Sequence, residues 1–372
     1  MKNRGITLVA LVITIVILLI LAAISISALT NQGLFGKAKE AREKSENSQK
    51  EEQETLNQYE DEINNYIIGV KKIKDNVGKV LSKVQNIELQ DEKGNKIILP
   101  AGFKITNDAT TVDKGIVIED ATETATKGSQ FVWIPVGTIT KSDGTKTTIT
   151  LGRYEFNSST GVENTYSGNY IEEDVNDITT IQNKGNTIAK NITNFKQSAT
   201  KNGGYYIGRY EARTTTKRTS AENTLTQITE KGTDQIYNYV KQSQAANLAQ
   251  SMYDNTQTFT SDLMNSYSWD TAITFIQKCT NQSKYSWQKS LNQTLSQTGT
   301  TIDIQCNIFD MASNVVEWTT ETSDVSGHPC INRGGYCNDT NLYTSYRNNY
   351  DDNSASNVFI GFRPILYINI QY

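Results

Sequence analysis

The sequence predicts an α+β protein with a long N-terminal transmembrane and stalk α-helix, followed by a loop-rich domain of short strands. The 24 residues from Ile6 to Leu29 contain no charged side chain. Residues 37–53 are helix-forming but polar nearly all round. From residue 129 onward, short aromatic and β-branched runs alternate with long Thr, Asn and Gly loops, which is typical of strands joined by turns.

The overall composition excludes several function classes. The chain has 372 residues and a net charge of −4, so it lacks the basic surface that a nucleic-acid partner needs. Its single histidine, His328, rules out a multi-histidine metal site and leaves one residue for any Ser-His-Asp triad. His328 lies in a Gly/Pro loop, SGHPC, which favours an exposed histidine without a catalytic role.

The uncharged N-terminal run predicts a membrane-spanning helix. As a helix its 24 residues would extend about 36 Å, against about 30 Å for a bilayer core. Lys2 and Arg4 precede the run, so this end is expected in the cytoplasm and the large domain outside the cell. The alternatives are a cleaved secretory signal and an uncleaved signal anchor.

The stretch KNRG followed by ITLVALVITIV resembles the start of type IV prepilins. The resemblance implies a leader over residues 1–5, cleavage by a prepilin peptidase between Gly5 and Ile6, and methylation of the new N-terminus. It also implies a pilin-core helix over 6–29 that packs against other pilin subunits. Ala10 stands where the family usually has glutamate, which fits a minor or tip subunit, a pseudopilin-like protein or a membrane anchor.

Two segments connect this helix to the large domain. Residues 30–69 are predicted as a stalk helix, with a kink or a break at Gly33 and Gly36, and a disordered charged linker is the alternative for 37–53. Residues 70–128 carry short β-branched runs around the turn signals EKGN and PAG. They predict a small β-rich connector.

Residues 129–372 form the predicted large domain. Its one clear helical pattern is YSWDTAITFIQKC, in which Ala272, Phe275 and Ile276 share one face. Ser268 or Asp270 is expected near the N-cap of this helix.

Six segments of this domain together resemble the sulfatase-modifying factor family, whose best-known members generate formylglycine. In family order they are FVWIPVG (131–137), YYIGRYEA (205–212), SWDTAITF (268–275), NVVEW (314–318), RGG (333–335) and GFR (361–363). The resemblance implies a loop-rich, C-type lectin-like fold. The oxidases of the family bind copper through two cysteines that follow the RGG motif, and here only Cys337 follows it. Oxidase activity is therefore not expected.

All four cysteines lie in the last hundred residues, at Cys279, Cys306, Cys330 and Cys337. No CxxC pair is present, which argues against a zinc site. Outside the cell they could form one or two disulfides, with three possible pairings, or remain buried thiols.

The family resemblance also implies a calcium site in the loop before the EW motif. The matching positions are Asp310, Ser313, Val315 and Glu317, which combine carboxylates with backbone carbonyls as Ca²⁺ prefers. The alternative is that Asp310 caps a turn and Glu317 pairs with an arginine such as Arg333 or Arg363.

Residues 338–357 predict a recognition surface, because 17 of these 20 positions are Asn, Asp, Tyr, Ser or Thr. Tyrosine supplies rigid contact area, and Asn and Ser supply adaptable hydrogen bonds. We call the expected ligand contacts the five recognition residues: Tyr343, Tyr346, Asn348, Asn349 and Tyr350. The layout also resembles the variable proteins of diversity-generating retroelements. An ordinary exposed polar loop is the alternative.

Together these features predict a cell-surface protein, pilin-like or membrane-anchored, that displays a non-catalytic binding domain for an extracellular protein or glycan. An exported enzyme of the sulfatase-modifying type is the first alternative. A passive minor pilus subunit is the second. Calcium is the one expected cofactor.

Overall fold

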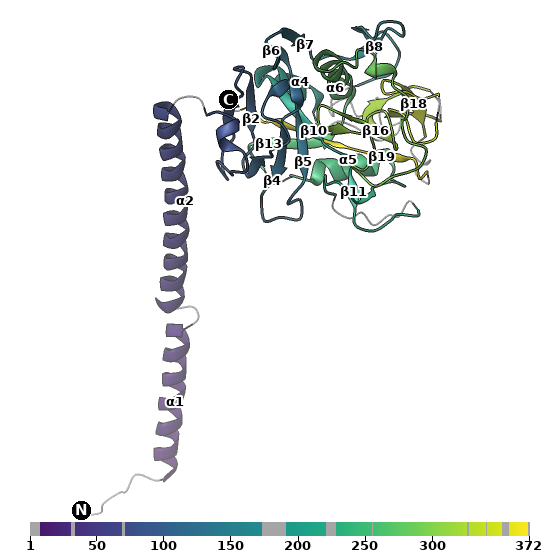
Figure 1. Ribbon diagram of the computed structural model, residues 1–372. Coiled ribbons are helices and arrows are strands. Elements are labelled where there is room, and N and C mark those ends of the chain that lie inside the picture. The colour runs from purple at the N-terminus through teal and green to yellow at the C-terminus, as the bar shows by residue number, and fades with distance from the viewer. Residues whose placement is uncertain are drawn as a thin grey trace, which may run out of the picture. The chain divides into compact units, whose positions relative to one another are not determined.

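The computed structural model divides into two compact units, Met1–Gly69 and Val70–Tyr372 (Figure 1). The structure describes residues 8–30, 34–68, 71–172, 191–220, 228–254, 256–325, 327–339, 341–351 and 357–370. The predicted processing site at Gly5 and Ile6 lies outside these residues.

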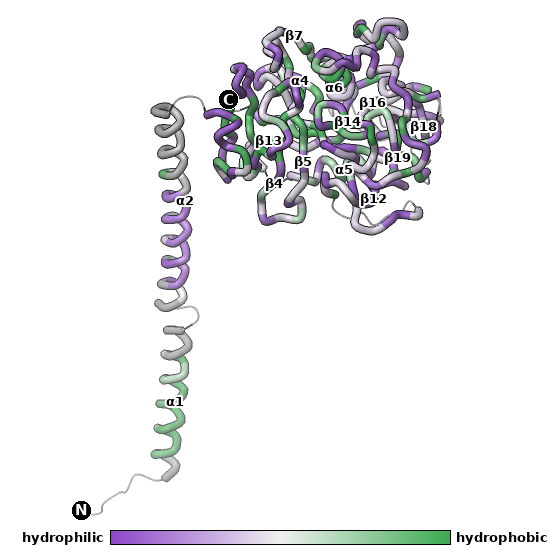
Figure 2. Tube along the Cα trace, in the orientation of Figure 1, coloured by the Kyte–Doolittle hydropathy of each residue, from purple (hydrophilic) through white to green (hydrophobic). Residues whose placement is uncertain are grey.

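The first unit contains two helices, α1 (Leu8–Thr30) and α2 (Leu34–Ile68). The hydropathy trace shows α1 as apolar and the central part of α2 as hydrophilic (Figure 2). Helix α2 carries ion pairs four residues apart, Lys44 with Glu40 at 2.9 Å and Arg42 with Glu46 at 2.8 Å. Such pairs stabilise an exposed polar helix.

The predicted long transmembrane and stalk helix is wrong. The segment forms two separate helices, and within the described residues no helix combines the length and the apolar character needed to cross a membrane. The prediction placed the apolar membrane-spanning segment over 6–29 and the polar stalk over 30–69, with a kink or a break at Gly33 and Gly36. In the structure the longer helix, α2, is the polar one. What the structure shows is a mixed, sheet-rich α+β protein.

A six-stranded antiparallel sheet forms the centre of the second unit. Its strands, in spatial order, are β13 (Phe259–Leu263), β20 (Pro364–Ile368), β10 (Gly204–Gly208), β5 (Gln130–Pro135), β4 (Val117–Asp120) and β3 (Phe103–Ile105). Strand β10, GYYIG, is buried at every position, as expected of a central strand covered on both faces. The expected boundary between residues 128 and 129 falls between β4 and β5, so the connector and the large domain share this sheet.

A second sheet of four strands presents the recognition region. Its strands, in spatial order, are β18 (Arg347–Tyr350), β17 (Cys330–Arg333), β16 (Val316–Thr322) and β19 (Ile360–Phe362). Strands β16 and β19 run parallel, and the other neighbours run antiparallel. Strand β18 is at one edge of the sheet as the structure describes it.

Short hairpins and 3₁₀ turns decorate these sheets. The hairpins are β1 (Ile87–Gln90) with β2 (Lys96–Leu99), β6 (Gly137–Thr140) with β7 (Lys146–Ile149), β8 (Tyr154–Phe156) with β9 (Glu163–Thr165), β11 (Arg213–Thr214) with β12 (Gln235–Ile236), and β14 (Ile304–Gln305) with β15 (Ile308–Phe309). The 3₁₀ turns are η1 (Lys74–Asn76), η2 (Val112–Lys114) and η4 (Tyr285–Trp287).

The α-helices of the second unit include α4 (Ile192–Lys201), α5 (Gln242–Ser251) and α6 (Ser266–Cys279). The helix predicted over YSWDTAITFIQKC is confirmed as α6, with Ala272, Phe275 and Ile276 fully buried. Its N-cap is Asn265 and not Ser268 or Asp270. Ser268 instead completes a capping box, donating from its backbone N–H to the Asn265 side chain at 2.8 Å.

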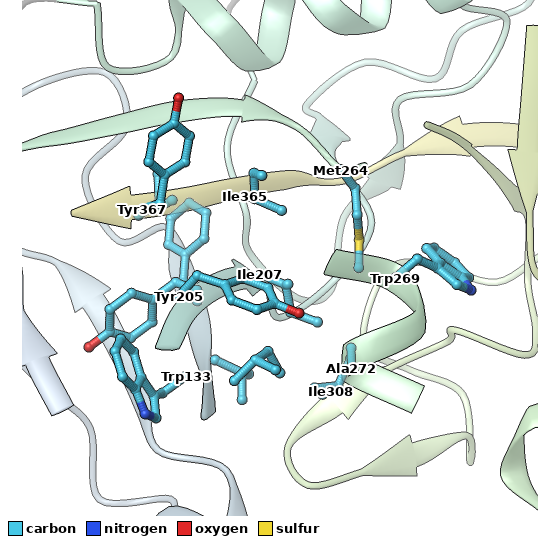
Figure 3. Packing of buried hydrophobic residues seen from close by; sticks show 14 of the residues in the cluster. Trp133, Tyr205, Ile207, Met264, Trp269, Ala272, Ile308, Ile365 and Tyr367 are labelled. Atoms are coloured by element: carbon cyan, nitrogen blue, oxygen red, sulfur yellow. The ribbon is translucent and has the colours of Figure 1, made fainter. Parts of the chain in front are cut away.

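The hydrophobic core lies between the six-stranded sheet and α6 (Figure 3). Trp133 of β5 packs edge-on against Tyr206 of β10, with ring centroids 4.9 Å apart. Met264, Trp269 and Ala272 extend the same cluster toward the four-stranded sheet. These buried aromatic rings pack closely between the central strands and make this part of the core rigid.

Candidate functional site

The five recognition residues lie on β18 and in the loop before it. All five are half-buried, so each has both a packing contact and an exposed surface. In the β17–β18 ladder, Asn348 pairs with Asn332 and Asn349 pairs with Ile331. Tyr350 pairs with Cys330 and packs against the core, which makes it the most structural of the five.

Two of the recognition residues belong to an aromatic cluster. Tyr343 stacks on Trp287 of η4, with ring centroids 4.1 Å apart and an interplanar angle of 26°. Tyr346 meets Tyr343 edge to face at 5.2 Å. Stacked and edge-to-face rings contribute about 0.5–1.5 kcal/mol beyond their burial, so this cluster holds its geometry before any ligand arrives.

The backbone beneath these rings is fixed at both sides. Thr344 and Ser345 donate from their N–H groups to the carbonyl oxygens of Gln288 and Ser286, at 3.0 and 2.9 Å. The indole N–H of Trp269 donates to the carbonyl oxygen of Thr344 at 2.9 Å. The polar loop is therefore anchored to η4 and α6 although its composition resembles that of a mobile segment.

A buried ion network lies behind β18. Arg347 donates to Asp270 at 2.5 Å and to Glu321 at 3.0 and 3.1 Å. Arg333 donates to Asp270 at 2.5 Å and to Glu321 at 3.4 Å. Arg153 also donates to Glu321. The side chains of Asp270, Glu321 and Arg333 have no exposed surface, so these carboxylates are fully desolvated and depend on the arginines.

The network controls the ionisation of Glu321. Burial acts to raise the pKa of this carboxyl, but the positive charges of Arg347, Arg333 and Arg153 outweigh it and hold the pKa below its usual range. Nearby Glu172 behaves in the opposite way. Burial and the negative charge of Glu321 raise the pKa of Glu172 to about 7, although Thr320 and Ser266 donate to it at 2.5 and 2.8 Å.

Two further tyrosines extend the aromatic surface from the loop after β9. The guanidinium carbons of Arg347 and Arg153 lie 4.1 and 4.7 Å from the ring centroid of Tyr166. Tyr170 stacks on Tyr166, with ring centroids 6.5 Å apart. We define the tyrosine face as Tyr166, Tyr170, Trp287, Tyr343 and Tyr346. Tyr166, Tyr170 and Trp287 were not among the predicted site residues, although the two tyrosines lie in the polar stretch NTYSGNY.

The predicted calcium positions are brought close together, but Glu317 does not fit a calcium ligand. Arg363 donates to the two carboxylate oxygens of Glu317 at 2.5 and 2.7 Å, and both side chains of this pair are buried. This is the arginine pairing given above as the alternative. Ser313 accepts from the N–H of Leu291 through its hydroxyl at 3.0 Å, and Val315 is buried.

Asp310 keeps one carboxylate oxygen free. Thr301 donates to Oδ1, while Oδ2 is buried without a hydrogen-bond partner among the described residues. Glu211 has a similar arrangement, because Asn314 donates to its Oε1 at 3.0 Å and its Oε2 has no partner there. Burial, and after it the charge of Asp310, raises the pKa of Glu211, and burial raises that of Asp310 to about 7. Two buried carboxyls that repel each other would be stabilised by a cation.

In the part of the chain that the structure describes, no group of three or more His, Cys, Asp or Glu side chains is arranged to hold a metal ion. A cation at Asp310 and Glu211 would need amide or carbonyl oxygens to complete its shell. All four cysteines are in the thiol form, three of them buried and Cys306 half-buried. The structure thus has the thiol form of the two alternatives given above.

A cavity of about 910 Å³ lies elsewhere in the second unit, between β3, the turn after β4 and the end of α5. Its threonine wall is already hydrogen-bonded internally: Thr122 and Thr126 donate to the buried Asp120 at 2.5 and 2.6 Å. Its aromatic floor, Phe103 and Phe259, belongs to the core. Because these threonines already bond to Asp120 and the rings belong to the core, we favour the tyrosine face as the recognition site.

No protein-family model, curated protein or solved structure matches this chain. The resemblances to prepilins and to sulfatase-modifying factors therefore rest on the quoted motifs. The expected lectin-like fold likewise has no matching solved structure.

Proposed function

We propose that this chain is a ligand-binding protein whose recognition surface is the tyrosine face together with β18. The observation that carries the proposal is an aromatic surface supported by a buried ion network. Arg347 and Arg333 are fixed by buried carboxylates, Arg347 lies over the ring of Tyr166, and half-exposed aromatic rings stand on an anchored loop. Rigid aromatic side chains on a fixed base lose little entropy on binding, which favours recognition.

We infer that the ligand is a protein segment. Strand β18 ends its sheet as described, and an edge strand offers backbone N–H and C=O groups to an added extended strand. Asn348 and Asn349 flank that edge with adaptable amides, and the tyrosine rings supply apolar contact. A glycan stacking on the same rings is the competing ligand class.

We propose further that the N-terminal segment displays this unit outside the cell as part of a pilin-like assembly. In α1 most of the described side chains are apolar and about half exposed, for example Leu18 at 60% and Leu19 at 65%. Such a helix needs an apolar partner, and the prepilin resemblance suggests that other pilin-type subunits supply it. Processing by a prepilin peptidase after Gly5 would release this helix for assembly.

A second proposal concerns calcium. Asp310 and Glu211 each present an unpartnered carboxylate oxygen in the same buried region, beside the amide of Asn314. Carboxylate oxygens are ligands of the type that Ca²⁺ takes. The cation would neutralise their repulsion and stabilise the base of the second unit. Glu317 is left out because Arg363 occupies it.

The binding proposal is tested with a random peptide library displayed on phage and selected on the immobilised full-length protein. Selected peptides should bind the wild type and lose at least tenfold in affinity for the double variant Tyr343→Ala/Tyr346→Ala. The matched control is Thr138→Ala/Thr148→Ala on the β6–β7 hairpin, an exposed pair bonded at 2.8 Å, which should bind normally. Equal loss in both variants would contradict the assignment. If the protein binds neutral oligosaccharides on a glycan array and selects no peptides, the ligand is a glycan and not a protein segment.

A further inference from the structure

Two of the four cysteines share a hollow on the second unit, well separated in sequence from the recognition residues. The hollow has a volume of about 430 Å³. Its lining residues are Asp113, Lys114, Cys279, Thr280, Asn281, Cys306 and Asn307. Cys279 is the last residue of α6, and Cys306 lies in the turn between β14 and β15.

The turn holds Cys306 in an unusual conformation. Cys306 and Asn307 are the two turn residues, and their φ angles are 48° and 63°. A two-residue hairpin with both φ values positive favours Asn or Gly, and for a cysteine this conformation is uncommon. It persists only where surrounding contacts impose it. The cysteine is therefore positioned by the fold and not by its own backbone preference.

The contacts that impose this conformation come from η2 and the residue after it. Asn307 donates through its side-chain amide to the carbonyl oxygens of Gly115 and Lys114, at 2.8 and 3.2 Å. A Cβ atom on Gly115 would lie 1.9 Å from the carbonyl oxygen of Cys306, so only glycine allows the turn to come so close. The Cys306 thiol lies 3.7 Å from the carbonyl oxygen of Asp113. The turn is thus clamped onto η2, which itself packs against α6.

The pKa values of both thiols are raised. Burial raises the pKa of the Cys279 thiol to about 12, and the charge of Asp113 adds to the shift. Burial also raises the pKa of Cys306, and the next largest contribution comes from Cys279. Lys114, Lys141 and Lys278 face Cys279 and partly offset these effects. Both groups are therefore protonated at neutral pH, and the small thiolate fraction that reacts increases as the pH rises.

We propose that Cys279 and Cys306 form an oxidisable dithiol that a low-molecular-weight disulfide converts to an intramolecular disulfide bond. One thiolate attacks the small disulfide, forming a mixed disulfide and releasing one small thiol. The second cysteine then displaces the other small thiol. The protein loses two electrons and two protons, and the reagent gains them as two thiols.

The bond would join residues 27 positions apart and would close a loop that contains η4. A cross-link of this loop length restricts the unfolded chain and stabilises the folded one. Cys330 and Cys337 are buried, with 0% and 1% of their surface exposed, so a soluble reagent should react with the first pair selectively.

The test treats the full chain at pH 8 with oxidised glutathione and maps unreduced proteolytic peptides by mass spectrometry. We expect a peptide pair bridged by Cys279 and Cys306, lighter by two hydrogens and separated by dithiothreitol. The oxidised protein should melt about 5 °C higher than the reduced protein. Cys306→Asn, which suits the positive φ of the turn, should remove the bridge and the shift, while the control Cys337→Ser should keep both.

Three outcomes would overturn the proposal. A bridge to Cys330 or Cys337 would show that the hollow does not direct the reaction. Persistent glutathione adducts without a bridge would show that the two thiols cannot meet. If the protein stays unreacted under conditions that fully oxidise a small free-thiol standard, the hollow is closed to the reagent.

Discussion

Replacing Glu321 by glutamine keeps the shape of this buried side chain and removes its charge. Glu321 accepts from Arg153, Arg333 and Arg347, so the variant leaves Arg333 and Arg347 with Asp270 as their shared carboxylate and takes from Arg153 the carboxylate to which it donates. Breaking a buried ion pair from one side costs about 3–5 kcal/mol, because the remaining charge stays desolvated. For a unit of this size that corresponds to a fall in melting temperature of roughly 6–15 °C.

The same substitution changes how stability depends on pH. Because the folded-state pKa of Glu321 is lowered, its contribution is present above its ordinary value of 4.5 and is lost as the pH falls through the folded-state pKa. The stability difference between wild type and Glu321→Gln should therefore be largest at neutral pH and shrink below about pH 4.5.

Urea unfolding followed by tryptophan fluorescence measures both effects in the full chain at pH 7 and pH 4. The matched control is Glu163→Gln, whose partner Lys278 lies 2.5 Å away in a partly exposed pair. Such a pair contributes about 0–1 kcal/mol, so the control should change little. A loss below 1 kcal/mol for Glu321→Gln, or a loss that does not vary with pH, would refute the description of this network.

Four further predictions follow from the same structure. Replacing all five recognition residues by alanine should abolish binding of the selected peptides while the melting temperature stays within a few degrees; unfolding would instead make these residues structural. Ca²⁺ should raise the melting temperature of the wild type and not of Asp310→Asn, with Asp143→Asn on the exposed β6–β7 turn as control; an unchanged response in Asp310→Asn would reject the site. Because the pKa of Glu172 is raised from 4.5 to about 7, wild-type stability should fall between these pH values, so Glu172→Gln should gain relative to wild type from pH 5 to pH 8; a constant difference would count against this ionisation. N-terminal sequencing of the protein from its producing cells should begin at Ile6, and a start at Met1 would exclude prepilin processing.

Local sequence patterns predicted the elements that depend on local physics. The 3.6-residue period placed Ala272, Phe275 and Ile276 on the buried face of α6, and the aromatic run GYYIG marked the central strand β10. The expected boundary between residues 128 and 129 depends on tertiary pairing, which local patterns do not show. The strands on its two sides, β4 and β5, are neighbours in one sheet.

The candidate site shows the same division. The polar and aromatic composition of residues 338–357 indicated a recognition loop, but nothing in it indicated that Arg347 would pair with Asp270, 77 positions away. Trp287 and Tyr166 join the face for a similar reason: they come from separate loops, and only tertiary packing brings them to β18. The N-terminal prediction placed the change from an apolar to a polar segment near residue 30, where α1 ends at Thr30 and α2 begins at Leu34. Its error was the membrane-spanning helix, because no helix among the described residues is long and apolar enough to cross a membrane.

Hydrogen–deuterium exchange of the full chain, with and without the tightest selected peptide, tests the central proposal most directly. If the tyrosine face is the recognition surface, bound peptide should slow amide exchange in residues 343–350, with weaker protection around Tyr166 and Trp287. Protection confined to residues 247–259, which line the 910 Å³ cavity, would place binding there and contradict the account.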